Sequence, residues 1–183
     1  VINISNSFLS SSVTGTNATC NSTATGSAAY SPVLPGVTYQ WSTNPIQATP
    51  TAIGLGAGSY VLTATDALGC SIALPVTITQ PQALTIASLQ VVNETCAGQG
   101  NGSAGIAMVG GTMPYSYVWS NGATTPSITA GAGTYNVSVT DANGCAPVNA
   151  TAVINAAGQP NIASAGPDLV ACQGAYPIGL QAT

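Results

Sequence analysis

The chain contains no lysine, arginine or histidine, and its 183 residues carry a formal net charge of −4 at pH 7. The acidic residues are Asp66, Glu94, Asp141 and Asp168. Nucleic-acid binding depends on Lys and Arg to neutralise phosphates, so no nucleic-acid partner is expected. Nucleophilic sites of the Ser-His-Asp or Cys-His kind lack their base. The composition therefore argues against an enzyme and predicts neither catalytic residues nor a cofactor.

Aromatic residues and long apolar runs are also scarce. Aromatics make up 5% of a chain that is 45% hydrophobic, so its core must consist mainly of Val, Ile, Leu and Ala. No apolar run approaches the ~18 residues of a membrane helix, so this segment is expected to have no membrane span. The chain opens on Val1 rather than Met, and we expect it to be a mature or excised piece of a longer protein.

What the chain does have is an internal repeat. Residues 58–70 and 133–145 both read as a strand, a tight turn and a cysteine, 75 positions apart. Tyr135, Val137 and Val139 alternate, which places them on one face of a strand. The strand ends in a turn, because Asn-Gly tolerates positive φ angles and Asp bonds the backbone just beyond it. The predicted turn residues are Asp66, Asp141, Asn143 and Gly144.

The repeat divides the chain into modules. Gln80-Pro81 and Gln159-Pro160 mark the boundaries, which gives module one at 1–81, module two at 82–160 and the beginning of a third module at 161–183. We expect an all-β fold of small Ig-like β-sandwiches arranged end to end. The 23-residue tail is too short to bury a core, so we expect it to pack on β-structure from elsewhere. Other copies or further modules of the same protein are the predicted partners.

Cysteine spacing suggests a covalent brace for each module. Cys20 and Cys70 are 50 residues apart, and Cys96 and Cys145 are 49 apart. Five cysteines with recurring spacing indicate an oxidising, extracellular setting. We therefore predict the disulfides Cys20–Cys70 and Cys96–Cys145, each worth roughly 4 kcal/mol in the chain-entropy model. Buried free thiols are the alternative, and Cys172 is left unpaired within the chain.

The remaining candidate residues have structural interpretations beside functional ones. Trp41 and Trp119 are predicted to lie in the core, although stacking on a sugar is the alternative. Tyr60 and Tyr135 each follow a Gly-rich corner, as a tyrosine corner does.

Acidic and loop residues complete the candidates. Asp66 and Asp141 occupy equivalent positions in separate modules, so they cannot act as a glycosidase pair on one substrate. Calcium needs several oxygen ligands clustered in space, and zinc needs Cys or His sets that are missing, so no metal is predicted. Met113 and Tyr115 lie in a loop-like approach and are predicted to be exposed contacts. Several Asn-x-Ser/Thr motifs leave glycosylation open.

Four stretches resemble the SprB-type repeat of large surface adhesins in gliding Bacteroidetes. They are Cys96-Ala-Gly98, Gly110-Gly-Thr-Met-Pro-Tyr-Ser-Tyr-Val-Trp-Ser-Asn-Gly122, Ala130-Gly-Ala-Gly-Thr-Tyr135 and Val139-Thr-Asp-Ala-Asn-Gly-Cys145. Module one is a divergent copy, since it lacks the Gly-Gly-Thr-x-Pro-Tyr stretch. The tail resembles the opening of PKD- and Ig-like modules. The resemblance implies tandem β-sandwiches on long proteins exported across the outer membrane, which serve adhesion and motility without catalysis.

Two classes of function stay open at this point. The first is a structural segment of an extracellular stalk or filament. The second is a module displayed on the cell surface whose exposed loops bind a glycan or another partner.

Overall fold

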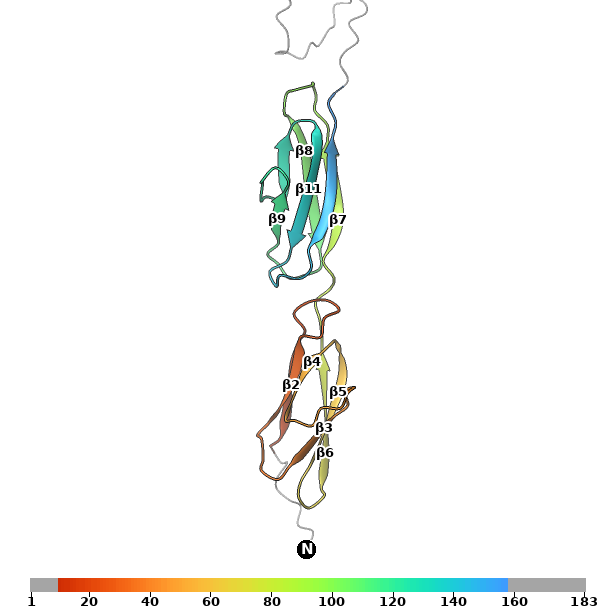
Figure 1. Cartoon of the computed structure of the whole chain (residues 1–183), viewed down its shortest axis with the longest axis vertical. Coiled ribbons are helices and arrows are strands. Elements are labelled where there is room, and N and C mark those ends of the chain that lie inside the picture. The colour runs from red at the N-terminus through yellow and green to blue at the C-terminus, as the bar shows by residue number, and fades with distance from the viewer. Residues whose placement is uncertain (1–9, 158–183) are drawn as a thin grey trace, which may run out of the picture. The chain divides into compact units, whose positions relative to one another are not determined.

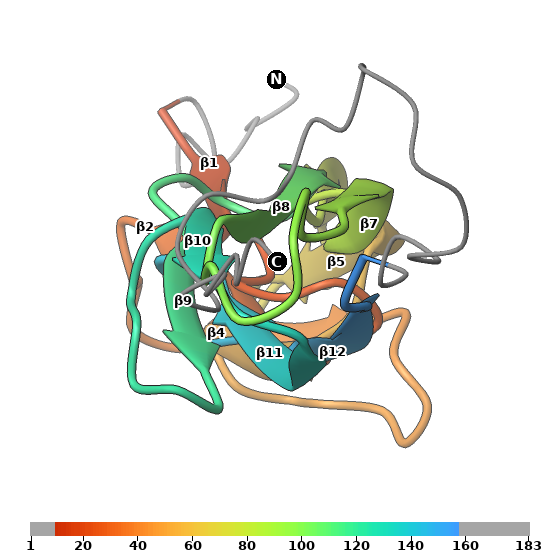
Figure 2. The same cartoon turned by 90° about the horizontal axis from the view of Figure 1, so that it is seen from above.

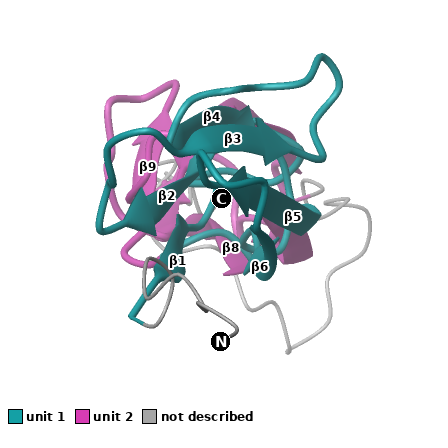
Figure 3. Ribbon diagram, turned by 90° about the horizontal axis from the view of Figure 1, so that it is seen from below, with its two compact units in different colours: residues 1–83, 110–112 teal, residues 84–109, 113–183 magenta. Residues whose placement is uncertain are grey.

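The computed structural model describes residues 10–157, and this range contains twelve β-strands. The chain separates into two compact units, which are residues 1–83 with 110–112 and residues 84–109 with 113–183 (Figure 3). Across the described range, no helix is long and apolar enough to cross a membrane. The all-β class expected from the alternating pattern is confirmed. The tail at 161–183, including Cys172, lies outside the described residues.

Unit one contains the first six strands in two three-stranded antiparallel sheets, β1-β2-β4 and β3-β5-β6 (Figure 1). The strands are β1 (Ser12–Thr16), β2 (Gly26–Ser31), β3 (Thr38–Trp41), β4 (Thr51–Leu55), β5 (Gly58–Thr65) and β6 (Ser71–Ile78). Pro75 lies in β6, which is the edge strand of its sheet. Proline has no backbone N–H, and it is tolerated at an edge because one side of an edge strand has no neighbouring strand to hydrogen-bond.

Unit two repeats this topology with sheets β7-β8-β10 and β9-β11-β12, which Figure 2 shows end on as two layers. Its strands are β7 (Thr85–Val92), β8 (Gly102–Val109), β9 (Ser116–Trp119), β10 (Ser127–Ala130), β11 (Gly133–Thr140) and β12 (Val148–Ile154). The two sheets of each unit share one hydrophobic core, so each unit is a β-sandwich.

A tryptophan lies in each core, contributed by the short strands β3 and β9. Trp41 and Trp119 are almost fully buried, and their indole Nε1–H groups donate to the carbonyls of Thr49 and Thr125, both at 2.9 Å. A buried indole needs such a partner, because an unpaired N–H in an apolar core is costly.

The first and last strands of each unit meet near their C-terminal ends. In unit one, Thr79 N–H donates to Asn17 Oδ1 at 2.9 Å, and Ala18 N–H donates to the Thr79 carbonyl at 2.9 Å. In unit two, Asn155 N–H donates to Asn93 Oδ1 at 3.0 Å, and Glu94 N–H donates to the Asn155 carbonyl at 3.1 Å. We call this repeated contact the end brace.

The predicted disulfide Cys20–Cys70 is wrong, because Cys70 is a free, exposed thiol. The physical reason is the length of β6. Cys70 immediately precedes this eight-residue strand. Cys20 lies beyond its other end, where Asn21 Nδ2 donates to the Pro81 carbonyl at 3.1 Å. Eight residues of strand span about 26 Å, whereas the Cα atoms of a disulfide lie within roughly 7 Å.

The pairing Cys96–Cys145 is wrong for the same reason. Cys145 lies just before the start of β12, and Cys96 follows Glu94, which bonds to Asn155 just past the end of that strand. The seven residues of β12 separate the two ends by about 23 Å. Nevertheless Cys20, Cys96 and Cys145 are each disulfide-bonded.

Candidate functional site

The outer face of sheet β9-β11-β12 in unit two carries uncharged polar side chains. Because strand residues alternate between faces, Val137 and Val139 enter the core while Asn136 and Ser138 face outward. The strand register places Thr151 opposite Asn136. It also places Asn149 and Val118 on either side of Ser138. The sequence thus builds two cross-strand rows of Asn, Ser, Thr and Val.

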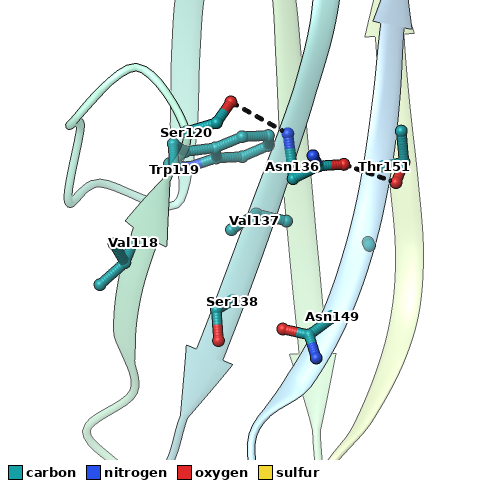
Figure 4. A pocket seen from close by; sticks show the side chains of 9 residues that line it. Val118, Trp119, Ser120, Asn136, Val137, Ser138, Asn149 and Thr151 are labelled. Carbon is teal, nitrogen blue, oxygen red and sulfur yellow. Dashed lines mark hydrogen bonds between the residues drawn. The ribbon is translucent and has the colours of Figure 1, made fainter.

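A shallow groove of about 570 Å³ runs over this face (Figure 4). Its lining comprises Val118, Trp119, Ser120, Asn136, Val137, Ser138, Asn149, Ala150 and Thr151. Thr151 Oγ1 donates to Asn136 Oδ1 at 2.8 Å, and Asn136 N–H donates to Ser120 Oγ at 3.2 Å. These bonds hold the Asn136 row in place.

The chemistry of the groove is that of amides and hydroxyls. Its lining has no ionisable side chain, so it offers neither a general base nor a charged anchor. Asn149 is exposed beside the partly buried Ser138, and Val118 is 59% exposed. Such a surface can hydrogen-bond a neutral polar ligand and cover a small apolar patch. Within the described residues, no cluster of His, Cys, Asp or Glu could hold a metal ion.

The matching face of unit one differs in chemistry. Register places Val61 opposite Pro75, and Thr63 opposite Ala73, at the positions of the Asn136 and Ser138 pairs. Ser42 Oγ accepts from Val61 N–H at 2.9 Å, so the backbone arrangement is retained. The asparagines Asn136 and Asn149 thus have apolar counterparts, Val61 and Ala73, in unit one, where the amide on this face is that of Gln40, opposite Thr63.

The predicted tyrosines occupy equivalent corners. The Tyr60 hydroxyl donates to the Gly56 carbonyl at 3.1 Å, and the Tyr135 hydroxyl donates to the Gly131 carbonyl at 3.0 Å. Both rings are partly buried against the cores of their units. Each bond spans four residues and fastens the Gly-rich corner to the strand that follows.

The predicted turn residues close the hairpins β5–β6 and β11–β12. Asp66 Oδ1 accepts from the N–H groups of Leu68 and Cys70, both at 2.9 Å. Asp141 Oδ1 accepts from Cys145 N–H at 3.0 Å, and Gly144, at φ 67°, donates to the Asp141 carbonyl. Asn143 is exposed in this turn. The two aspartates therefore organise backbone in separate units.

The two predicted contact residues, Met113 and Tyr115, differ in exposure. Met113 is 75% exposed, whereas Tyr115 is half-buried against the core of unit two. Neither residue lines the groove. Burial, followed by repulsion from Tyr115, raises the pKa of Tyr117 above its ordinary value of 10.0.

The sequence did not predict a contact in unit two that we call the carboxylate latch, in which the Glu94 side chain accepts hydrogen bonds from backbone N–H groups of the loop that follows it. Glu94 is only 4% exposed, and its carboxylate accepts from Gly100 N–H at 2.7 Å and from Gly98 N–H at 3.4 Å. The sequence signal that could have revealed this contact is the only glutamate of the chain, which is followed by Gly98 and Gly100. Both glycines have positive φ angles, 77° and 65°. Sequence reasoning also missed the groove, because Asn, Ser and Thr are common throughout the chain.

Comparisons with known proteins give one family match. The SprB repeat model matches residues 88–124. No curated protein matches the chain. Among solved structures, a C-terminal 282-residue fragment of intimin, in complex with the intimin-binding domain of its translocated receptor, is 16% identical with a TM-score of 0.42. This similarity covers 79% of our chain and 63% of the fragment, so the chain spans less than two thirds of it.

Two further solved structures contain Ig domains. The N-terminal eight Ig domains of Down syndrome cell adhesion molecule, isoform 1.30.30, are 15% identical with a TM-score of 0.34, covering 81% of this chain and 24% of that one. The amphioxus IgVJ-C2 molecule is 14% identical with a TM-score of 0.33, covering 79% and 96%. Of these comparisons, the family model alone identifies a sequence motif: residues 88–124 match the SprB repeat.

Proposed function

We propose that this chain is a non-enzymatic, tension-bearing segment of an extracellular bacterial surface filament or adhesin stalk. The SprB match supports an adhesion-related surface protein. We extend this adhesion-related role to a longer parent protein that is exported across the outer membrane and serves adhesion and gliding motility. Further units of the same parent are the proposed partners.

The observation that carries the proposal is the end brace. β7 and β12 are in contact, and both finish where Asn93 and Glu94 bond to Asn155, so the two strands run side by side in the same direction (Figure 1). The chain enters unit two at the start of β7 and leaves it at the end of β12. Pulling on the two ends therefore slides these strands past one another and loads the brace bonds together. Unit one has the same arrangement between β1 and β6.

Single-molecule pulling of the purified chain from its two termini, in reducing buffer, tests this function. Wild-type protein should unfold in discrete, cooperative force peaks. Asn17→Ala and Asn93→Ala each remove one brace bond and should lower the peak of the corresponding unit. Asn121→Ala is the matched control, since Asn121 Oδ1 accepts only from Ala123 N–H inside one turn, at 3.1 Å. Smooth extension of wild type without peaks contradicts a tension-bearing role.

A binding role for unit two is the second candidate, favoured by the groove over its β9-β11-β12 face. Its amide and hydroxyl lining suits a neutral surface glycan or a polar protein segment. A glycan array probed with wild type, Ser138→Tyr and Thr63→Tyr provides the test. Ser138→Tyr fills the groove, and Thr63→Tyr makes the same change at the equivalent position of unit one. Saturable binding lost only in Ser138→Tyr supports this role, and no wild-type binding argues against a glycan ligand.

A further inference from the structure

The outward edge of strand β10 in unit two presents backbone hydrogen-bonding groups. Ile106 N–H donates to the Pro126 carbonyl at 3.0 Å, so residue 126 faces β8. Residues of an antiparallel pair alternate in the side toward which their backbone groups point, so Ile128 also faces β8. Ser127 and Thr129 therefore direct their N–H and C=O groups away from the sheet, and both residues are exposed.

The equivalent edge of unit one, strand β4, is closed by a side-chain amide. Gln47 Oε1 accepts from Ile53 N–H at 3.0 Å, and Gln47 Nε2 donates to the Ile53 carbonyl at 2.9 Å. We call these two bonds the amide clamp. A carboxamide offers the same donor and acceptor as a peptide group, so Gln47 exchanges the two bonds that a residue of an added strand would exchange. A register shift between Gly26 and Ser27 also makes this edge irregular.

Unit two repeats the frame around this edge without the amide clamp. Trp41 N–H donates to the Gln47 carbonyl at 2.9 Å, and the same bond in unit two joins Trp119 N–H to the Ala123 carbonyl at 2.9 Å. Ala123 thus takes the place of Gln47, and its side chain packs against the core of unit two. The register of β10 with β8 is continuous over its four residues. Among the described residues, no side chain hydrogen-bonds the backbone of Thr129.

The place beside β10 is where related sandwiches carry another strand. Immunoglobulin constant-type sandwiches pack a sheet of four strands on a sheet of three, and the fourth strand pairs with the strand that corresponds to β10. Unit two has three strands in each sheet, in the orders β7-β8-β10 and β9-β11-β12. One strand added beside β10 would complete the larger sheet.

The chemistry of β10 favours a second copy of itself as that strand. Charged side chains commonly protect sheet edges, but β10 has none, and Glu94 and Asp141 of unit two are each only 4% exposed. Two β10 strands therefore meet without repulsion between like charges. In an antiparallel pair with its two-fold axis at Ile128, Ser127 lies opposite Thr129 of the second copy. Each of the two symmetry-related pairs can exchange both backbone bonds, and Ser and Thr side chains also interact favourably across strands.

The other sheet edges of the two units are less available. On β3 and β9, the N–H groups of Trp41 and Trp119 bond to carbonyls of the loops that follow these strands. The edge strands β1 and β6 lie in contact with each other, as do β7 and β12. The amide clamp closes β4 at Ile53. These contacts leave β10 as the edge best suited to accept a strand.

We propose that the outward edge of β10 is a self-association site, at which β10 of a second copy of this chain adds as an antiparallel strand. The two three-stranded sheets then join into one continuous sheet, and neither hydrophobic core changes. Because the paired strand has only four residues, the dimer is weak and reversible. The inference goes beyond the tension-bearing role, which concerns a single chain.

Sedimentation velocity of the full chain tests the association, after alkylation of the free Cys70 thiol so that it cannot link two copies. The weight-average mass of wild type should rise from monomer toward dimer with concentration. Thr129→Pro removes the outward N–H but no bond to β8, so this variant should stay monomeric, and Thr129→Val is the matched control that keeps the N–H. A monomeric wild type, a folded Thr129→Pro that associates normally, or an equal loss in Thr129→Val overturns the proposal.

Amide hydrogen exchange gives a readout that needs no variant at β10. In wild type, exchange at Ser127 and Thr129 should slow as the concentration rises, whereas exchange at Ile53 should stay constant because Gln47 already holds its N–H. Exchange at Ser127 and Thr129 that does not depend on concentration contradicts the pairing. Gln47→Ala should speed exchange at Ile53 in dilute protein, and unchanged exchange would remove the comparison with unit one on which the proposal rests. Single-molecule pulling uses isolated chains, so its outcome is separate from this one.

Discussion

Replacing Gly102 by alanine should destabilise unit two, whereas the same change at Gly105 in the same strand should not. A Cβ on Gly102 would meet the side chain of Ile154 and two backbone carbonyls, Ala130 O at 3.0 Å and Val92 O at 3.2 Å. Backbone in the middle of a sheet cannot retreat easily. A Cβ on Gly105 would meet only Ser127 Cβ, at 3.7 Å, which is an ordinary contact.

The two substitutions should therefore change the free energy of unfolding in different directions. Overpacking a closed site costs about 1–3 kcal/mol, which lowers the Tm of a small domain by about 4–8 °C per kcal/mol. Gly105→Ala should be neutral or stabilising by about 0.5 kcal/mol, because alanine loses less backbone entropy in a strand.

Chemical unfolding followed by tryptophan fluorescence measures this difference. For the unit-two variants, Trp119 reports on unit two in a Trp41→Phe background that silences unit one. Gly26 has equally close neighbours, Ile78 Cγ2 at 2.7 Å and Leu55 O at 2.8 Å, so Gly26→Ala should repeat the loss in unit one, where Trp41 is the reporter in a Trp119→Phe background. Equal free energies of unfolding for Gly102→Ala and Gly105→Ala would refute the reasoning.

Three other perturbations have defined outcomes. Tyr135→Phe removes the corner hydroxyl bond and should lower the free energy of unfolding by about 1 kcal/mol in urea titrations. Glu94→Ala leaves the Gly100 N–H without its acceptor and should cost about 1–3 kcal/mol, with a smaller loss for Glu94→Gln; equal losses would argue against the latch. Because folding raises the pKa of Tyr117, its neutral form favours the folded state. That contribution is complete below pH 10.0 and is lost as the pH rises through the raised pKa. Ultraviolet titration of wild type against Tyr117→Phe checks this, and a midpoint at or below pH 10.0 for Tyr117 would contradict it.

Local pattern predicted the strands and failed on the cysteines, and the reason is geometric. The alternation of apolar and polar residues in β5 and β11 predicts which face of each strand is buried, and the Asp-x-x-Gly turns predict the hairpins. Both patterns can be read from the sequence because they are local in the chain. Matched spacings of about 50 residues say nothing about which end of a sandwich a cysteine reaches. An eight-residue strand such as β6 separates those ends by about 26 Å, and only the fold shows which end each cysteine occupies.

The candidate groove escaped prediction for a related reason. Its residues come from β9, β11 and β12, and they meet only through the strand register. Asn136 is one of many asparagines in the chain, and nothing near it in sequence distinguishes it. Glu94 was more accessible to reasoning, since a lone glutamate followed by two glycines suggests a carboxylate that receives backbone N–H groups.

The alternation of strand residues has a practical consequence for the groove. Asn136-Val-Ser138 and Asn149-Ala-Thr151 are both acceptor motifs for N-linked sugars, and residues two apart in a strand share a face. Both asparagines therefore present their side chains on the exposed face of β11 and β12. Protein secreted from a eukaryotic host would receive bulky carbohydrate directly on the groove, whereas protein made in a host without that pathway keeps the face bare. The choice of expression host thus decides whether any ligand of this face can be detected.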